Sequence, residues 1–180
     1  MYSQRIESSR YLKVEELMAI QSWIFRIKGY EYKLDPSNRK EAERYLKLPY
    51  KVLGSGKKRI AYDLKNGCVL KVAMNVNGMK DIERELEVYY TVSSKLKKHL
   101  AEIKEYGVGW IIMKKVKRRV PRKKSLKTRV KRLQKRFNRS NVAAGDLISV
   151  RKKKVRLSNI RLGKKGKIIV VDYGNFRLMA

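Results

Sequence analysis

The chain has 180 residues, 43% of them hydrophobic, and it carries 47 Lys and Arg against 16 Asp and Glu, a formal net charge of +31. The hydrophobic fraction excludes a disordered basic tail, and the length allows one domain with a sizeable core, with or without an extension. A single cysteine, Cys68, excludes an internal disulfide, and with a single histidine, His99, it argues against a structural zinc site.

The same totals bear on location and partners. No stretch approaches the roughly 20 apolar residues of a membrane span, and the first residues lack the apolar segment of a secretory signal. We therefore expect a soluble, cytoplasmic protein without membrane contact. The excess of positive charge predicts a polyanionic partner, such as nucleic acid, an acidic protein or nucleotide phosphates.

The first part of the chain is predicted to be helical. Residues 9–30 carry a broad apolar face at helical spacing, with Ser8 or Ser9 as the cap. A second, short helix is predicted after Pro36. We interpret residues 1–48 as a helical extension, and its apolar face predicts that it packs on the sheet that follows.

The next part, residues 49–116, reads as strands around a helix. Asn66-Gly67 is a strong hairpin signal between "RIAYDL" and "CVLKVAM". The stretch "GMKDIERELEVYYTVSSKLKKHLAEI" has a helical pattern, and "YGVGWIIMKKV" returns to strand.

The last part, residues 117–180, combines a basic segment with a closing hairpin. The basic segment is predicted to be helical from Ser125 onward, and "NIRL" and "IIVVDYG" form two strands around the turn "GKKGK". The order of helix, strands, helix, strands, basic helix and hairpin predicts an α+β fold and not a doubly wound sheet.

A glycine-containing turn stands in "LGSGKKRIAY". Gly54 and Gly56, on either side of Ser55, would let the backbone come close to a ligand and aim its N–H groups at phosphate oxygens. An ordinary glycine hairpin is the alternative interpretation.

A lysine in an apolar strand is the second candidate. Lys71, in "VLKVA", either points to solvent from an edge strand or meets a carboxylate, because burying its charge alone is costly. We choose Glu85, in "IERELEVYY", as its partner. Glu83 and Glu87 are alternatives, and a solvated helix face would need no partner at all.

The closing hairpin carries the third candidate. Asn159 lies just before its first strand and Asp172 at the end of its second, so both side chains can reach one site. An amide oxygen and a carboxylate suit Mg²⁺, which prefers hard oxygen ligands. A turn asparagine and a strand-end aspartate, each common alone, are the alternative.

In this order the motifs resemble the protein kinase-like superfamily over residues 49–116 and 141–174. "LGSGKKRIAY" is similar to the glycine-rich loop without its third glycine, "VLKVA" to the lysine strand, "WIIMKKV" to the hinge strand, and "SNIRL…IIVVDYG" to the metal-binding hairpin. The resemblance implies a kinase-like N-lobe, made of a twisted antiparallel sheet and a helix, and a reduced C-lobe that ends at the metal-binding hairpin.

The resemblance also implies cofactors and roles. ATP would be bound with Mg²⁺, the metal by Asn159 and Asp172, while Lys71, paired with Glu85, orients the phosphates. The residues implied to contact the nucleotide are Gly54, Ser55, Gly56, Lys71, Met113, Lys115 and Val116.

The catalytic base is where the sequence departs from the family pattern. The family places an aspartate five residues before the metal-binding asparagine, and Lys154 stands there. Asp146, in "AAGDL", resembles the aspartate of the "HGDL" motif of small-molecule kinases, with alanine in place of histidine. Its use requires the eight residues "ISVRKKKV" to loop out as a hairpin.

Two functions follow from these expectations. The first is an atypical protein kinase-like enzyme with Asp146 as the base and a protein hydroxyl as the acceptor, as in serine/threonine kinases. The second is a catalytically inactive pseudokinase that binds nucleic acid or an acidic protein. The compact, highly charged chain is typical of a viral or phage protein, for which the site of action would be the host cytoplasm.

A basic segment offers the partner surface. Lys and Arg make up more than half of the residues from Lys114 to Arg139, and "RKKK" recurs from Arg151 to Lys154. Only Phe137 is aromatic in the first stretch, which favours contact with backbone phosphates over base stacking. The segment therefore predicts a nucleic-acid or acidic-protein partner.

Overall fold

The structure is a computed structural model of the chain, and it describes residues 8–29, 39–121, 124–145, 147–149 and 153–179. They form two compact units, one of Met1–Ile82 with Ile103–Lys115 and one of Glu83–Glu102 with Val116–Ala180. The boundary between the units falls inside one helix, α3 (Val76–Thr91). The division into segments at residues 48 and 116 stays a prediction.

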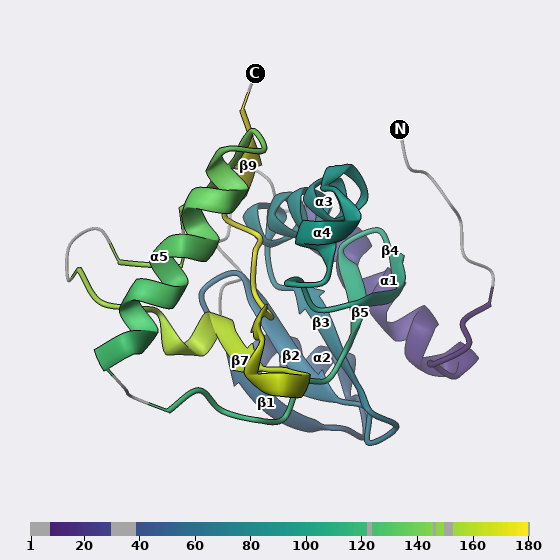
Figure 1. Cartoon of the computed structure of the whole chain (residues 1–180). Helices are drawn as coiled ribbons and strands as arrows, with labels where there is room; N and C mark the ends of the chain where they lie inside the picture. Colours follow the sequence, from purple (N-terminus) through teal and green to yellow (C-terminus); the bar gives the residue numbers. More distant parts are fainter. Residues whose placement is uncertain (1–7, 30–38, 122–123, 146, 150–152, 180) are drawn as a thin grey trace. The chain divides into compact units, whose positions relative to one another are not determined.

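The first unit is built on a five-stranded antiparallel sheet in the order β1-β2-β3-β5-β4 (Figure 1). Its strands are β1 (Lys51–Ser55), β2 (Arg59–Asp63), β3 (Cys68–Ala73), β4 (Ile103–Gly107) and β5 (Trp110–Lys114). The predicted turn joins β2 to β3, and Gly67 adopts there a φ of +87°, which only glycine tolerates readily. β3 lies in the centre of the sheet, so its side chains are largely buried on both faces.

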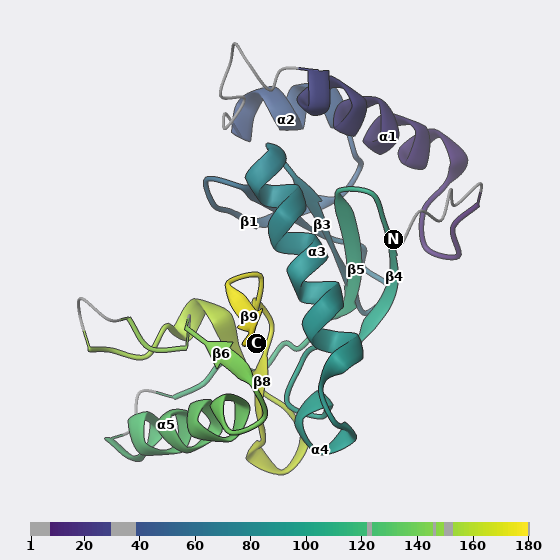
Figure 2. The ribbon, with the colours of Figure 1, turned by 90° about the horizontal axis from the view of Figure 1, so that it is seen from above.

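Two helices of the N-terminal segment complete the first unit, α1 (Val14–Gly29) and α2 (Arg39–Leu46), which lie side by side in Figure 2. The indole N–H of Trp23 donates a 2.8 Å hydrogen bond to the carbonyl oxygen of Ala73, at the end of β3. Ile24 fills the space above Gly109, where an added Cβ would lie 2.4 Å from its Cδ1 atom. The apolar face of α1 therefore packs on the sheet, as the sequence predicts.

The start of α1 differs from the prediction. The hydroxyl of Ser9 accepts the N–H groups of Tyr11 and Leu12, which forms a separate turn and not the first turn of the helix. The carboxylate of Glu16 then accepts the N–H of Lys13, and α1 begins at the next residue. A serine side chain satisfies a local turn as readily as a helix end, so the pattern did not distinguish them.

The helix predicted from Gly78 to Ile103 is wrong in its second half. α3 ends at Thr91, and a short helix, α4 (Ser94–Lys97), follows. Ala101 then bonds to the carbonyl of Val170, within the second unit. Ile103 begins β4 in the first unit, where it pairs with Met113. Long-range strand pairing overrides the helical pattern here, and sequence spacing does not encode it.

The second unit contains the basic helix and two small sheets. Its remaining elements are α5 (Lys124–Asn138), β6 (Val142–Ala144), β7 (Ile160–Leu162), β8 (Ile168–Val170) and β9 (Phe176–Leu178), with 3₁₀ turns at Leu157–Asn159 and Lys164–Gly166. β6 pairs with β9 and β7 with β8, both antiparallel. Phe176 packs edge-on against Phe137, with ring centres 5.3 Å apart, so β9 closes the core under α5.

The predicted α+β class is confirmed, as are the basic helix and the closing hairpin. The strands β6 and β9 were not predicted, because three-residue strands carry too little pattern. None of the helices in the described ranges is both long and apolar enough to span a bilayer.

Candidate nucleotide and metal site

The β7–β8 hairpin brings the two predicted metal ligands to one end. Ile160 pairs with Val170, and the N–H of Val171 donates a 2.8 Å hydrogen bond to the carbonyl of Asn159. Asn159 therefore pairs with Val171, the residue that precedes Asp172. Its side chain is buried, and its Oδ1 atom accepts a 2.7 Å hydrogen bond from the Ser158 hydroxyl.

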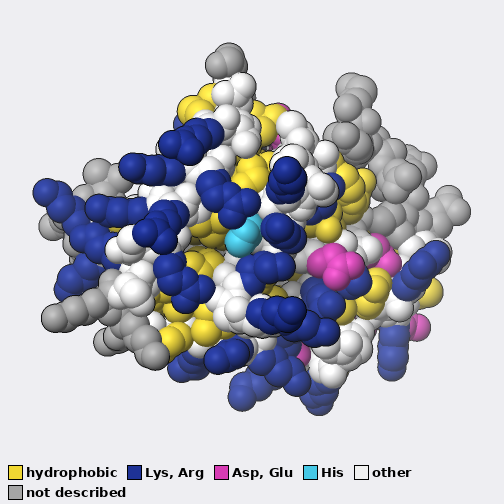
Figure 3. Space-filling view, in the orientation of Figure 1, with side chains coloured by type: hydrophobic (Ala, Val, Ile, Leu, Met, Phe, Trp, Pro, Cys, Tyr) yellow, Lys and Arg dark blue, Asp and Glu magenta, His cyan; other side chains and the backbone are white. Residues whose placement is uncertain are grey.

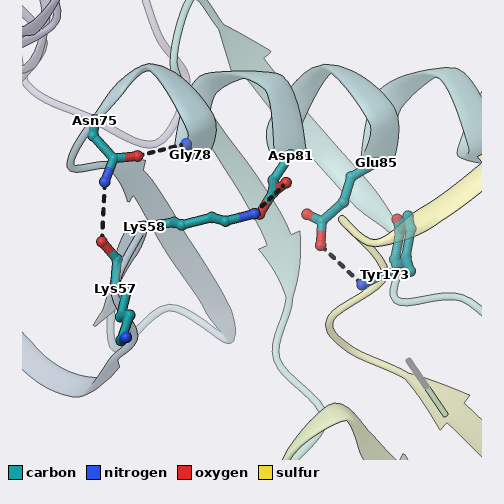
Figure 4. A network of polar contacts seen from close by, with 7 residues as sticks. All are labelled: Lys57, Lys58, Asn75, Gly78, Asp81, Glu85 and Tyr173. Carbon is teal, nitrogen blue, oxygen red and sulfur yellow. Dashed lines mark hydrogen bonds and ion pairs between the residues drawn. The ribbon is translucent and has the colours of Figure 1, made fainter. Parts of the chain in front are cut away.

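Hydrogen bonds also hold Tyr173, the residue that follows Asp172. The N–H of Tyr173 donates a 3.0 Å hydrogen bond to Oε1 of Glu85 (Figure 4). The Tyr173 hydroxyl donates to the carbonyl of Ala101 at 3.2 Å. Tyr173 is completely buried. The corner at Asp172 is thus fixed by one hydrogen bond from the residue before it and two from the residue after it.

Glu85 is distinguished from its alternatives by burial. Its side chain is 0% exposed, whereas Glu83 and Glu87 on the same helix face solvent. A buried carboxylate needs hydrogen-bond donors to offset the loss of water, and the Tyr173 amide supplies one. The interpretation of Glu85 as part of a solvated helix face is therefore wrong.

Lys71 lies in the central strand β3, opposite Ala61 in β2 and Ile111 in β5. The edge-strand alternative is wrong, because strands pair on both sides of β3 and the lysine is buried. A buried lysine needs a partner for its charge inside the protein. The pairing of Lys71 with Glu85 stays a prediction.

The glycine turn lies where β1 passes into β2. β1 has a bulge between Val52 and Gly54, and the N–H of Gly56 donates to the carbonyl of Arg59 at 3.0 Å. A Cβ atom added to Gly54 or Gly56 would meet nothing within 4 Å, and Ser55 between them is exposed. The fold itself therefore gives no steric reason for these two glycines, unlike Gly109.

The exit of this turn is tied to the start of α3 by contacts that the sequence analysis missed. Lys58 reaches both carboxylate oxygens of the buried Asp81 at 3.1 Å (Figure 4). Asn75 accepts the N–H of Gly78 at 2.9 Å, which caps α3, and donates its amide to the Lys57 carbonyl at 3.1 Å. An asparagine just before a helix is a capping signal that could have been read from the sequence.

A second missed residue, Arg161, supports the turn that carries Asn159. The guanidinium of Arg161 donates to the carbonyls of Leu157, Ser158 and Ile160, around the turn that carries Asn159. Burial lowers the pKa of Arg161, and the nearby Arg119 lowers it further. An arginine two residues after the asparagine gives no pattern in the sequence by which this role could be recognised.

Met113, Lys115 and Val116, the residues predicted to contact the nucleotide near the hinge, differ in their backbone hydrogen bonds. Met113 pairs within the sheet with strands on both sides, opposite Val69 and Ile103. The N–H of Lys115 donates a 2.8 Å hydrogen bond to the carbonyl of Gly67, and its amine contacts Asp63. Val116 lies beyond the end of β5 and outside the sheet.

Near the candidate base, the described residues on either side of residues 150–152 pair with each other. The N–H of Arg156 donates to the carbonyl of Leu147 at 3.0 Å, and the N–H of Ser149 donates to the carbonyl of Lys154 at 2.9 Å. Ile148 and Val155 form an antiparallel bridge between them. Asp146 itself, like Arg151, is outside the described residues, and Lys154, the residue five before Asn159, is exposed.

The donor set fits a magnesium ion with few protein ligands. Among the described residues, no three His, Cys, Asp or Glu side chains gather as a metal cluster. The hairpin instead offers one amide oxygen and one carboxylate. Mg²⁺ usually takes one or two protein ligands of this kind and completes its shell with phosphate oxygens and water.

Comparison with known proteins finds similarity in structure alone. No protein-family model and no curated protein matches the sequence. Among solved structures, the chain is similar to the Legionella pneumophila Lpg2603 kinase bound to IP6, with 16% identity and a TM-score of 0.48 over 73% of this chain and 51% of that one. The chain thus spans about half of that protein's length.

Two further solved structures are similar to the chain. The bifunctional kinase-methyltransferase WbdD is 12% identical, with a TM-score of 0.47 over 69% of this chain and 31% of that one. The streptomycin-ATP-APH(2")-IIa ternary complex is 14% identical, with a TM-score of 0.47 over 83% of this chain and 75% of that one.

Proposed function

We propose that the chain is an ATP- and Mg²⁺-dependent phosphotransferase of protein kinase-like type whose acceptor is a protein hydroxyl. The observation that carries the proposal is the direct hydrogen bond between Leu147 and Arg156, with Ile148 and Val155 bridged beside it. When residues 148–155 are left out of the count, Asp146 stands five positions before Asn159. That is the spacing between the catalytic aspartate and the metal-binding asparagine in protein kinases.

The metal corner supports the same proposal. Asn159 and Asp172 would hold Mg²⁺, which would neutralise charge on the ATP phosphates when bound. The hydrogen bonds on both sides of Asp172 hold its backbone in place without any ligand. A preorganised carboxylate of this kind costs little reorganisation when the nucleotide arrives.

The remaining roles follow the predicted site. Gly54, Ser55 and Gly56 would cover the phosphates, for which the open space around both glycines leaves room. Lys71 and Glu85 would orient those phosphates. Of the hinge residues, Val116 is the best candidate for backbone contact with adenine, since Met113 is committed to strand pairing and the Lys115 amide bonds to Gly67.

Asp146 would act on the acceptor. Its carboxylate takes the proton from the acceptor hydroxyl while the oxygen bonds to the γ-phosphorus, and the bond from that phosphorus to the β–γ bridging oxygen breaks to release ADP. Loss of such a base typically costs about 10²–10⁴ in rate. A protein acceptor fits the net charge of +31 better than a cationic antibiotic, which this charge would repel.

The test is transfer of labelled γ-phosphate from ATP with Mg²⁺, to the protein itself and to a cell lysate. Asp172→Asn should abolish transfer, and Asp146→Asn should lower it by the factor expected for a lost base. Glu15→Gln, an exposed carboxylate on α1, is the matched control and should leave transfer unchanged. Transfer that persists in Asp172→Asn would overturn the proposal.

An inactive nucleotide-binding module is the second candidate, favoured by Ala144, which stands where the "HGDL" motif of small-molecule kinases has histidine. For this function, Mg²⁺-ATP should raise the melting temperature in the wild type and not in Asp172→Asn, with no label transferred by either. That result would replace the enzyme by a pseudokinase and leave the site assignment standing.

A further inference from the structure

A basic surface in the second unit shares no residue with the candidate nucleotide site. α5 buries Leu126, Val130, Leu133 and Phe137, which lie on one stripe of the helix. The exposed cations of α5 are Lys127, Arg129, Lys131, Arg132, Lys135 and Arg136, and Arg139 follows its last turn. They occupy nearly all of the solvent side of the helix, and Lys and Arg side chains gather over α5 in Figure 3.

Two contacts extend this surface beyond the helix. Arg129 donates to the carbonyl of Gly166, in the turn between β7 and β8. Arg136 lies 3.3 Å from the Nε2 atom of His99, whose Nδ1 atom is 2.9 Å from the carbonyl of Ile168. The exposed lysines of these neighbouring segments are Lys98, Lys164, Lys165 and Lys167. Together with the α5 cations they form what we call the basic face.

Among the described residues, no carboxylate is available to neutralise the cations of the basic face. Gln134 donates to the carbonyl of Ala144, so an uncharged amide joins α5 to β6. Within the described residues, no carboxylate forms an ion pair with an α5 cation. In the whole stretch from residue 116 to 180 the acidic residues are Asp146 and Asp172.

We infer that the basic face docks on the phosphate backbone of a double-stranded nucleic acid, without reading its sequence. α5 is about 22 Å long, at 1.5 Å per residue. A duplex of that length carries roughly 13 phosphate charges. The surface offers guanidinium and ammonium groups, which bind phosphate oxygens, and no exposed aromatic side chain on α5 for stacking on unpaired bases.

Two other polyanions fit the face less well. Insertion into an anionic membrane surface needs a free apolar side on the helix, but the apolar side of α5 is buried in the protein. An acidic protein would present carboxylates in a particular arrangement, whereas the cations here cover nearly all of the exposed arc of a helix. Such even coverage suits the regular charge of a duplex better.

The test is binding of a fluorescently labelled DNA duplex over a range of salt, by anisotropy. The test variant is Arg132→Gln/Lys135→Gln/Arg136→Gln. The matched control, Lys13→Gln/Lys28→Gln/Arg44→Gln, removes the same charge from α1, α2 and the residue before α1. Each phosphate contact contributes about 0.9 to the slope of log affinity against log salt, so the slope of the test variant should fall by about 2.7. At 0.1 M salt the variant should then bind about 500-fold more weakly. The control should keep the wild-type slope.

A duplex RNA of equal length should bind with a similar slope, because neither bases nor sugars are read. Equal losses in the two variants, or wild-type slope in the test variant, would show that net charge and not this face binds the duplex. Polyglutamate or anionic vesicles that displace the duplex at equal charge concentration would overturn the nucleic-acid assignment in favour of those partners. Melting temperatures of both variants confirm that they fold.

His99 provides a readout that net charge alone would not move. Burial lowers its pKa, as do the nearby Arg136, Lys167 and Lys98, while the bond to the Ile168 carbonyl raises it. A phosphate seated among these cations would offset their repulsion of a protonated imidazole. The pKa of His99, followed by NMR, should therefore rise on adding duplex. An unchanged pKa with duplex bound would place the duplex elsewhere.

Discussion

The glycine turn and the metal corner are both parts of the predicted nucleotide site, but they are held in opposite ways. The corner at Asp172 is pinned on both sides by hydrogen bonds to buried groups, Asn159 and Glu85 among them. The glycine turn is exposed, and the side-chain contacts that hold it lie at its exit, at Lys57 and Lys58. A metal ligand needs a fixed position, whereas a loop that covers phosphates must admit them.

This difference predicts where substitutions affect stability and where they affect ligand binding. Changes at the corner should lower the free energy of unfolding whether or not ATP is present. Changes at the tip of the turn should leave the free energy of unfolding alone and alter ATP affinity.

The largest effect on stability is expected at Glu85. Glu85→Ala removes the buried acceptor of the Tyr173 N–H, so the free energy of unfolding should fall by about 1–3 kcal/mol, the cost of an unsatisfied buried donor. Glu85→Gln keeps an oxygen there and should lose less. Denaturant unfolding of both variants measures the difference, and equal losses would mean that the charge and not the hydrogen bond matters.

Tyr173→Phe should have a smaller effect at the same corner. It removes the hydroxyl that donates to the Ala101 carbonyl and leaves the ring packed, so we expect a loss of about 1 kcal/mol in denaturant unfolding. Tyr11→Phe, at a partly exposed tyrosine before α1, is a control for the same chemical change. A loss for Tyr173→Phe no greater than that of the control would contradict a pinned corner.

Asp81→Asn tests the tie at the exit of the glycine turn. The Lys58 side chain is 41% exposed, so solvent screens the pair and the expected loss in the free energy of unfolding is only about 0.5–1 kcal/mol. Hydrogen exchange at Gly56 and Lys57 should become faster, because the turn loses an anchor. Unchanged exchange there would show that Asn75 alone holds the turn.

The smallest effect on stability is expected at Gly54. Gly54→Ala places a methyl group in open space, so the free energy of unfolding should change by less than about 0.5 kcal/mol while ATP binds more weakly. Gly78→Ala is the matched control, because its methyl group would lie 2.1 Å from the Lys58 carbonyl oxygen and should destabilise the fold. Unchanged ATP affinity in Gly54→Ala would remove the turn from the site.

Local pattern was enough to predict several elements correctly. The Asn66-Gly67 turn, the helix from about Ser125 and the closing hairpin all depend on neighbours in sequence, such as turn residues and the spacing of apolar side chains. The same local information misplaced the start of α1 and extended α3 too far. In both places a distant or side-chain hydrogen bond decided the outcome.

The sequence by itself determined the α+β class, the positive charge and which residue types can carry the chemistry, since these depend on composition and local spacing. Only the tertiary structure decided that Lys71 is central, that Glu85 and not Glu83 or Glu87 is buried, and that Leu147 pairs with Arg156. Burial and strand pairing are relations between residues far apart in sequence. No local pattern fixes them, because the same side chain is stable in water or in the core depending on what packs against it.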